Sequence, residues 1–297
     1  MGGDFPVELK AAAGATEAVL DRLLTAGSPG VPERLIAAMR HAALAGGKRM
    51  RPFLVIESAR VFGMTGEGVV RAAAALECVH CYSLVHDDLP AMDDDSTRRG
   101  QPTVHKAFDE ATAILAGDAL LTLAFGILAA PLTDKDASVR ATLVAGLATA
   151  AGSSGMVGGQ MLDLAAEKQK LDVDDIRRMQ AMKTGALFRF ACEAGAILGR
   201  ASADKRARLA DFGSSVGLAF QLADDLIDAT GKPAKAGKAT AKDARRGKAT
   251  FVRLYGVKEA QAMLDRAVDD AVARIAPFGA QGAALAAAAR FAGSREA

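Results

Sequence analysis

The sequence predicts an all-α protein, and three observations lead to this prediction. Alanine and other good helix formers are abundant, while aromatic residues make up only 5% of the chain and tryptophan is absent. Runs that alternate apolar and polar residues, as half-buried strands do, are hard to find. The chain has 297 residues and is 51% hydrophobic. A chain of this length can bury about three quarters of its unfolded surface, so one large helical core is feasible.

Apolar residues recur at helical spacing along most of the chain. The pattern predicts helices at about 5–25, 31–45, 50–63, 68–89, 107–129, 136–151, 155–168, 173–199, 203–229, 258–274 and 281–290. Glycine and proline predict breaks at 28–30, 46–47, Pro90, Pro131 and 231–247. No linker and no internal repeat interrupts this series, so we expect residues 1–297 to form a single domain.

Residues 141–162 carry no formal charge and are about long enough to span a bilayer. Alanine, glycine, serine and threonine dominate the segment, which is therefore only weakly hydrophobic. We predict two buried helical pieces separated by a break near Gly152 and Gly155, and no membrane partner.

Charge and cysteine content narrow the class of protein further. The 37 basic and 35 acidic residues nearly cancel, which argues against nucleic acid as the main partner. Cys78, Cys81 and Cys192 are too few for a disulfide framework and are expected to pack in the core. The N-terminus lacks the pattern of a secretory signal, so we expect a cytoplasmic protein.

Two clusters of aspartates stand out in this apolar chain. The first comprises Asp87, Asp88 and Asp93, followed by Asp94 and Asp95, and the second comprises Asp224, Asp225 and Asp228. Two carboxylates about 6 Å apart repel by roughly 3 kcal/mol at an effective dielectric near 20, so each cluster requires cations. Bases and glycine follow each cluster, at 98–100 and 237–238. Acids for a hard divalent metal beside bases for phosphate oxygens predict a diphosphate held by magnesium.

The two clusters are expected at different places on their helices. Pro90 should end the first helix near Asp88, where the helix dipole disfavours negative charge. Six helical residues rotate by about 600°, so only a chain break lets Asp93 turn back toward Asp87. In the second cluster, Gln221, Asp224, Asp225 and Asp228 share one helical face. We expect that face to line a cavity; the alternative is a solvated polar stripe.

A basic segment follows the second cluster. Between Ala229 and Thr250 there are seven bases and one acid, Asp243. Such a segment is often only a solvated loop, but its position beside the aspartates favours closure over an anionic substrate. The Glu and His spacing of di-iron bundles is missing, and no motif supports Ser-His-Asp or Cys-His catalysis.

Taken in order, these motifs resemble the trans-isoprenyl diphosphate synthases, and among them the bacterial farnesyl diphosphate synthases. The resemblance runs from about residue 46 to 251. It rests on GGKRMRP at 46–52, YSLVHDDLPAMD at 82–93, RRG at 98–100, LAGD at 115–118, GGQ at 158–160 with Asp163, KTG at 183–185, FQ at 220–221 with the second aspartate cluster, and GK at 237–238 and 247–248 with Asp243.

The resemblance implies an isoprenoid-synthase-type helical bundle around a central cavity, usually a homodimer, with the aspartate clusters facing each other. It implies three Mg²⁺ ions bridging Asp87, Asp93 and Asp224 to an allylic diphosphate, supported by Asp88, Asp225 and Asp228. The positions that match allylic diphosphate contacts are Arg98, Lys183, Thr184, Gln221, Lys238 and Lys248. Those that match the isopentenyl diphosphate pocket are Lys48, Arg51, His80 and Arg99. Asp87, Asp93, Asp224, Lys183 and Lys238 would carry the catalysis.

By the same resemblance, Tyr82 and Ser83 would limit product length and give farnesyl diphosphate from dimethylallyl or geranyl primers. Geranylgeranyl diphosphate is the alternative product. A noncatalytic subunit is disfavoured because both aspartate clusters are intact, and a terpene cyclase because GGKRMRP implies a second diphosphate site. Two departures stand out: Ser96-Thr97 precedes the double arginine where relatives often carry Asp-Leu, and Arg295 is the only base at the extreme C-terminus.

Overall fold

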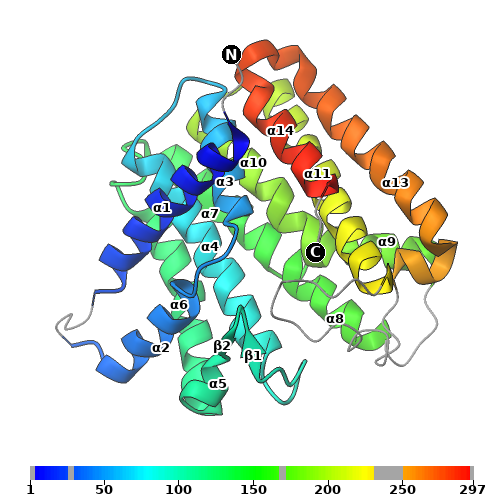
Figure 1. The fold of residues 1–297 in the computed structure, drawn as a ribbon. Coiled ribbons are helices and arrows are strands. Elements are labelled where there is room, and N and C mark those ends of the chain that lie inside the picture. Colours follow the sequence, from blue (N-terminus) through cyan, green and yellow to red (C-terminus); the bar gives the residue numbers. More distant parts are fainter. Residues whose placement is uncertain (1–3, 26–29, 167–171, 231–249, 295–297) are drawn as a thin grey trace.

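The computed structural model describes residues 4–25, 30–166, 172–230 and 250–294, and over these ranges it is a helical bundle (Figure 1). The all-α prediction is confirmed. The helices are α1 Phe5–Leu23, α2 Glu33–Ala43, α3 Met50–Arg60, α4 Glu67–Asp87, α5 Val104–Ala107, α6 Glu110–Ala129, α7 Ala137–Ala151, α8 Met156–Ala166, α9 Val173–Gln180, η1 Ala181–Gly185, α10 Ala186–Leu198, α11 Ala203–Thr230, α13 Phe251–Ile275, η2 Ala276–Gly282 and α14 Ala283–Gly293. Two short strands, β1 Thr97–Arg98 and β2 Gln101–Pro102, form an antiparallel hairpin.

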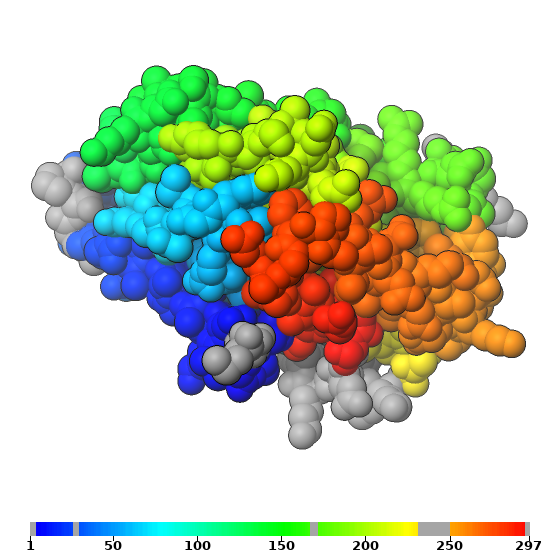
Figure 2. Space-filling model, turned by 90° about the horizontal axis from the view of Figure 1, so that it is seen from above, coloured from blue at the N-terminus to red at the C-terminus, as the bar shows by residue number. Residues whose placement is uncertain are grey.

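Helices α4, α10 and α11 carry much of the core. Helix α10 packs on α3, α7 and α11, while α4 packs on α3 and α6. Phe53, Phe188, Phe212 and Phe251 are fully buried, and each contributes a large apolar area to the core. Figure 1 shows that α4 and α11 both end toward the lower side of the bundle, where their aspartates lie. Figure 2 shows the green segment that contains α7 at the upper left and α13 in orange at the right.

Several helices begin at a residue whose side chain accepts a hydrogen bond from a backbone N–H group in the first turn. Asp109 accepts from the Thr112 amide at the start of α6, and Asp172 accepts from the Asp175 amide at the start of α9. Thr250 does the same for α13. Each such cap satisfies a backbone donor that the helix leaves without a partner, which stabilises the helix by about 1 kcal/mol.

The predicted helices agree with the observed ones within a few residues, except that the short helices α5 and η2 are absent from the prediction. Three further differences stand out. The stretch 173–199 is interrupted by a π-helical turn, η1, between α9 and α10. The hairpin at 97–102 is absent from the prediction, because a two-residue strand leaves no alternating pattern. Helix α13 starts at Phe251 rather than at 258, because it continues across a kink at Gly256, whose φ is 78°.

The uncharged segment forms two helices with the break at 152–155, as predicted. The prediction that both pieces are buried is wrong, because only 33% of the most apolar stretch of Ala137–Ala166 is buried. Among the described residues, three segments are long and apolar enough to cross a membrane, judged by length and composition alone: Glu67–Asp87, Glu110–Ala129 and Ala137–Ala166. In the fold these segments are α4, α6 and the broken α7–α8 pair, and α4 lies mainly in the core. All three cysteines are buried and free, so their predicted role in packing is confirmed.

Candidate active site

The first aspartate cluster forms a tight turn at the end of α4. Helix α4 ends at Asp87, and the chain then folds back after Pro90. The Asp93 amide donates to the Asp87 carbonyl at 2.7 Å, and the Asp95 amide donates to the Asp88 carbonyl at 3.2 Å. The predicted return of Asp93 toward Asp87 therefore occurs, and it is fixed by the backbone.

Asp88 lies behind this turn and holds Arg98. Its side chain is only 4% exposed, and its two oxygens accept from Arg98 Nε at 2.8 and 2.9 Å. A carboxylate–guanidinium pair in which both oxygens are engaged is strong and directional. Asp88 thus orients a predicted diphosphate-binding arginine.

Asp87 has an unfavourable environment for a negative charge. Burial raises its pKa to about 6, and the neighbouring charges of Asp93 and Asp88 add to this, while Lys183 and Arg98 oppose it. The influence of Lys183 indicates that a lysine from the middle of the chain lies within electrostatic range of the first cluster. A divalent cation between the carboxylates would relieve the same unfavourable charge.

The second cluster lies at the C-terminal end of α11, and its members differ in exposure. Asp224 is partly buried and Asp228 is exposed, whereas Asp225 is buried. Asp225 accepts from Gln221 Nε2 at 2.9 Å and from the Phe251 amide at 3.0 Å, which ties α11 to the start of α13. Burial raises the pKa of Asp225 to about 6.

The π-helical turn η1 is bonded both to α8 and to the helix that carries the second cluster. Thr184 Oγ1 donates to Gln221 Oε1 at 3.0 Å, so η1 is attached to the helix that carries the second cluster. Lys183 Nζ lies 2.5 Å from Asp163 Oδ2 on α8. Single π-turns inside α-helices occur frequently at functional sites.

Arg51 on α3 and Arg99 in the hairpin belong to a basic group whose charges interact with those of the acids. Arg51 stacks on the Phe188 ring, with its guanidinium carbon 4.6 Å from the ring centroid. Burial lowers the pKa of Arg51 to about 10, while Glu77 and Asp224 act in the opposite direction. Burial also lowers the pKa of His80 well below its usual range, and Arg51 and Arg99 contribute to the shift. His80 is therefore neutral at neutral pH.

The double arginine sits at the tip of the β1–β2 hairpin. Arg99 and Gly100 have φ values of 51° and 76°, as the two central residues of a type I′ turn require. Arg99 donates to the Gly46 carbonyl. Gly47 has a φ of 128°, and a Cβ there would lie 2.7 Å from the Arg99 guanidinium carbon, so glycine is needed at this position.

Residues of the GGKRMRP segment are held by a buried ion pair. The Arg49 side chain is fully buried, with one terminal nitrogen 2.5 Å from Glu77 on α4 and the other 2.6 Å from the Ala43 carbonyl. This pair anchors the backbone between Lys48 and Arg51. Lys48 is exposed, and its Nζ lies 5.5 Å from the centroid of the Phe291 ring.

The predicted length-determining residues lie on α4, just before Asp87. Tyr82 is 5% exposed, and its hydroxyl has no hydrogen-bond partner among the described residues. Its ring meets the His86 ring edge-on, with 5.7 Å between the ring centroids. The Ser83 hydroxyl donates to the His80 carbonyl at 2.9 Å.

Two predicted site residues, Lys238 and Lys248, lie outside the described residues, as does the basic segment that contains them. Within the described ranges, no group of three or more His, Cys, Asp and Glu side chains is arranged as a ready metal site. The carboxylates that fit magnesium come from two separate helices, α4 and α11, rather than from one preformed cage.

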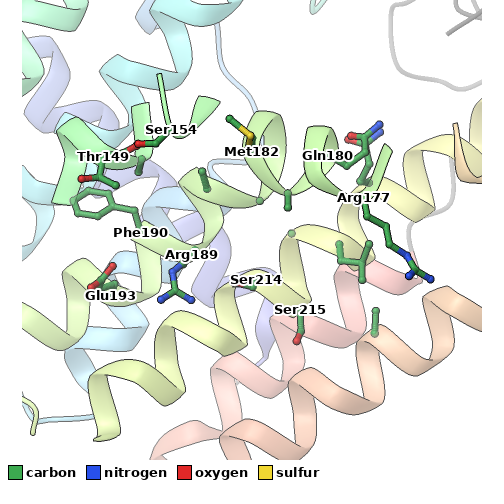
Figure 3. A pocket seen from close by; sticks show the side chains of 18 of the residues that line it. Thr149, Ser154, Arg177, Gln180, Met182, Arg189, Phe190, Glu193, Ser214 and Ser215 are labelled. Atoms are coloured by element: carbon green, nitrogen blue, oxygen red, sulfur yellow. The ribbon is translucent and has the colours of Figure 1, made fainter. Parts of the chain in front are cut away.

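A groove adjoins η1 and the helix that carries the second cluster. It has a volume of about 1530 Å³ and is lined by α7, η1, α10, α11 and α13. Figure 3 shows Thr149, Met182, Phe190 and Ser214 around it. Gln221 is the one predicted site residue that also lines this groove.

Two acids of the site have roles that the sequence does not reveal. Asp163 belongs to a motif, but its pairing with Lys183 joins residues from different helices and leaves no local pattern. Glu77 lies in an apolar helical run, and an acid in such a run is a signal that a buried base is nearby.

Known proteins resemble this chain over most of its length. Residues 32–276 match the polyprenyl synthetase family model. The chain is 44% identical to the farnesyl diphosphate synthase of Escherichia coli (strain K12) over 90% of each chain, and 39% identical to the geranylgeranyl diphosphate synthase of Cyanophora paradoxa over 88% of each. A crystal structure described as an FPP/GFPP synthase from Zymomonas mobilis superposes with a TM-score of 0.89 at 44% identity, covering 98% of this chain and 99% of that one. The chain belongs to the polyprenyl synthetase family.

Proposed function

We propose that this enzyme condenses isopentenyl diphosphate with dimethylallyl or geranyl diphosphate, head to tail, to give farnesyl diphosphate and pyrophosphate. The observation that carries the proposal is the pairing of acids and bases around one region. The Asp93 amide is bonded to the Asp87 carbonyl, the charges of Lys183 and Arg98 act on Asp87, and the charge of Asp224 acts on Arg51. Relatives over most of the chain are named as synthases of prenyl diphosphates.

Departure of pyrophosphate is the difficult step, because negative charge develops on the leaving oxygen. Lys183 and Arg98, which are held by Asp163 and Asp88, would donate to that oxygen and to the phosphates around it. Asp87, Asp93 and Asp224 would hold Mg²⁺, which when bound neutralises the diphosphate charge. We propose three ions, with Asp88, Asp225 and Asp228 as supporting residues.

The second substrate would sit in the basic group formed by Lys48, Arg51, His80 and Arg99. A neutral His80 can donate one N–H to a diphosphate without adding a charge. The isopentenyl double bond attacks the allylic carbon as its bond to the diphosphate breaks, and a proton then leaves. The released pyrophosphate is the base we propose for that proton.

Tyr82 supports a farnesyl product. Its buried ring lies on α4 a little more than one helical turn before Asp87, beside the His86 ring, where a growing chain would end. Geranylgeranyl diphosphate is the second candidate, because a relative of similar identity is named for it.

We also propose that the enzyme is a cytoplasmic homodimer formed from single-domain chains of residues 1–297. Helix α6 is strongly apolar, yet only 44% of its most apolar stretch is buried. Ile114 and Leu115 on α6 are 45% and 58% exposed. Exposed apolar surface of this kind marks a protein interface.

The proposed function is tested by an assay of the purified chain with labelled isopentenyl diphosphate and each allylic primer. With Mg²⁺, dimethylallyl and geranyl diphosphates should both be converted to a fifteen-carbon product, and chelation should abolish it. A twenty-carbon product would favour the geranylgeranyl alternative. No product with any primer, or equal turnover with chelator, would contradict the proposal.

A further inference from the structure

Lys183 is held by an ion pair that the proposed chemistry does not itself require. Its Nζ lies 2.5 Å from Asp163 Oδ2, and the two side chains are only 25% and 11% exposed. An ion pair shielded from water in this way is stronger than a surface pair, and it restricts a side chain that is otherwise flexible.

The backbones around this pair are pressed together. A Cβ at Gly159 would lie 2.6 Å from the Lys183 Cα and closer still to the Lys183 amide nitrogen. Asp163 follows Gly159 by four residues on α8, so the two lie on the same helical face. The face of α8 that touches the Lys183 backbone therefore also carries the carboxylate that receives its ammonium.

The charge of Lys183 also acts on the first aspartate cluster. Its charge lowers the pKa of Asp87 against the larger effect of burial, so the ammonium lies within electrostatic range of that carboxylate. The next residue, Thr184, is bonded to Gln221 at 3.0 Å. The segment of Lys183 and Thr184 is thus bonded to α8 and to α11.

Building on the proposed function, we propose that Asp163 is a positioning residue that aims the Lys183 ammonium at the leaving diphosphate. An ammonium has three donors, so one bond to Asp163 leaves two for diphosphate oxygens. Without Asp163 the ammonium can turn toward Asp87 and compete with Mg²⁺ for that carboxylate. A donor fixed before the reaction stabilises the developing charge without the cost of reorganisation.

The test is a double-mutant cycle on turnover. Wild type, Asp163→Asn, Lys183→Ala and the double variant are assayed with isopentenyl and dimethylallyl diphosphates and saturating Mg²⁺. Asp163→Asn should lower kcat on the order of tenfold or more, because a misdirected catalytic group costs up to about 100-fold. KM for isopentenyl diphosphate should stay within about twofold, because other residues form that pocket. In the Lys183→Ala background, Asp163→Asn should change kcat by less than about twofold.

Asp134→Asn is the matched control. The Asp134 side chain is 10% exposed and pairs with Arg200 at 2.8 Å, in the loop between α6 and α7. The same substitution there should lower the melting temperature and leave kcat unchanged. The melting temperature of every variant is measured to check that it folds. If Asp163→Asn does not fold, Asp163→Ser takes its place, with the same expected results.

Two results would overturn the inference while the proposed function stands: an active wild type with unchanged kcat in Asp163→Asn, or an equal loss of kcat with and without Lys183. The second result would mean that Asp163 acts on the fold rather than through Lys183. A wild type that forms no prenyl diphosphate would instead overturn the proposed function, and this inference with it.

Discussion

At the scale of single residues, the site is built from carboxylates held in unfavourable surroundings. Burial raises the pKa of both Asp87 and Asp225 to about 6. The two differ in what compensates for burial: Asp225 accepts two hydrogen bonds from the protein, whereas Asp87 is compensated only by the charges of Lys183 and Arg98, against those of Asp93 and Asp88. The buried negative charge of Asp87 thus reduces the stability of the fold at a position that suits a bound cation.

Asp87→Asn should stabilise the metal-free protein at pH 8 by on the order of 1–2 kcal/mol. The folded-state pKa of about 6 exceeds the unfolded value of 3.8, so the folded chain binds the proton more tightly. The loss of folding stability caused by the ionised Asp87 is therefore complete above pH 6. It shrinks as the pH falls from about 6 to about 4, and it vanishes below that window. Denaturant unfolding in chelator at about pH 8, 5 and 3.5 measures this. An Asn variant less stable than wild type at the highest pH would contradict it.

Tyr82→Ala should extend the product beyond fifteen carbons, because it removes a buried ring just before the first aspartate cluster. Tyr82→Phe is the matched control. It removes only a hydroxyl that lacks a partner among the described residues, so product length should be unchanged and stability equal or higher. Chromatography of the dephosphorylated products measures the chain length made by each variant. Unchanged length in Tyr82→Ala would place the limit elsewhere.

The motif residues of the site can be predicted from the sequence, but several of their roles cannot. The positions of Asp87, Asp93 and Asp224 follow from carboxylate clustering and helix geometry. Sequence spacing does not show that Asp88 is used by Arg98, or that Asp225 is used by the Phe251 amide. These pairings join separate elements, so only the packed structure reveals them.

At the scale of elements, the close contact between α8 and η1 determines where Lys183 lies. The sequence predicts one continuous helix over 173–199, because a π-turn adds only about one residue per turn and scarcely disturbs the apolar period. The sequence does not predict the hairpin either, because each of its strands is only two residues long. The other helices are predictable because each buries one apolar face.

Gly159→Ala should lower both stability and turnover, because the new Cβ would lie 2.6 Å from the Lys183 Cα. The chain must shift there, and we expect a loss of about 1–3 kcal/mol. Gly14→Ala is the control, because an added Cβ at this position in α1 meets nothing within 4 Å. It should stabilise the protein by roughly 0.5–1 kcal/mol. Equal stability effects of the two substitutions would show that α8 and η1 are not in close contact.

At the scale of the whole molecule, α6 leaves an apolar side exposed, and this is the surface that we propose as the dimer interface. Composition predicts a large helical core, but not which faces remain outside it, because that depends on how the helices pair. The packing of α4 on α6 and of α10 on α3 brings together helices that the sequence alone does not pair.

Leu115→Glu should weaken the proposed dimer by about 100-fold or more, since a buried charge at an interface costs about 3 kcal/mol or more. Leu254→Glu, on α13 and 40% exposed, is the control and should leave the assembly unchanged. Sedimentation equilibrium measures both. A Leu115→Glu protein with the same mass as wild type would exclude this face as the interface.

The most direct measurement is the rate of condensation in Asp87→Ala and Asp224→Ala, each at saturating Mg²⁺ and both substrates. If acids from α4 and α11 jointly hold the ions that draw pyrophosphate away, each variant should lose about 100-fold or more in kcat while remaining folded. A folded variant of either kind with the turnover of wild type would contradict the account.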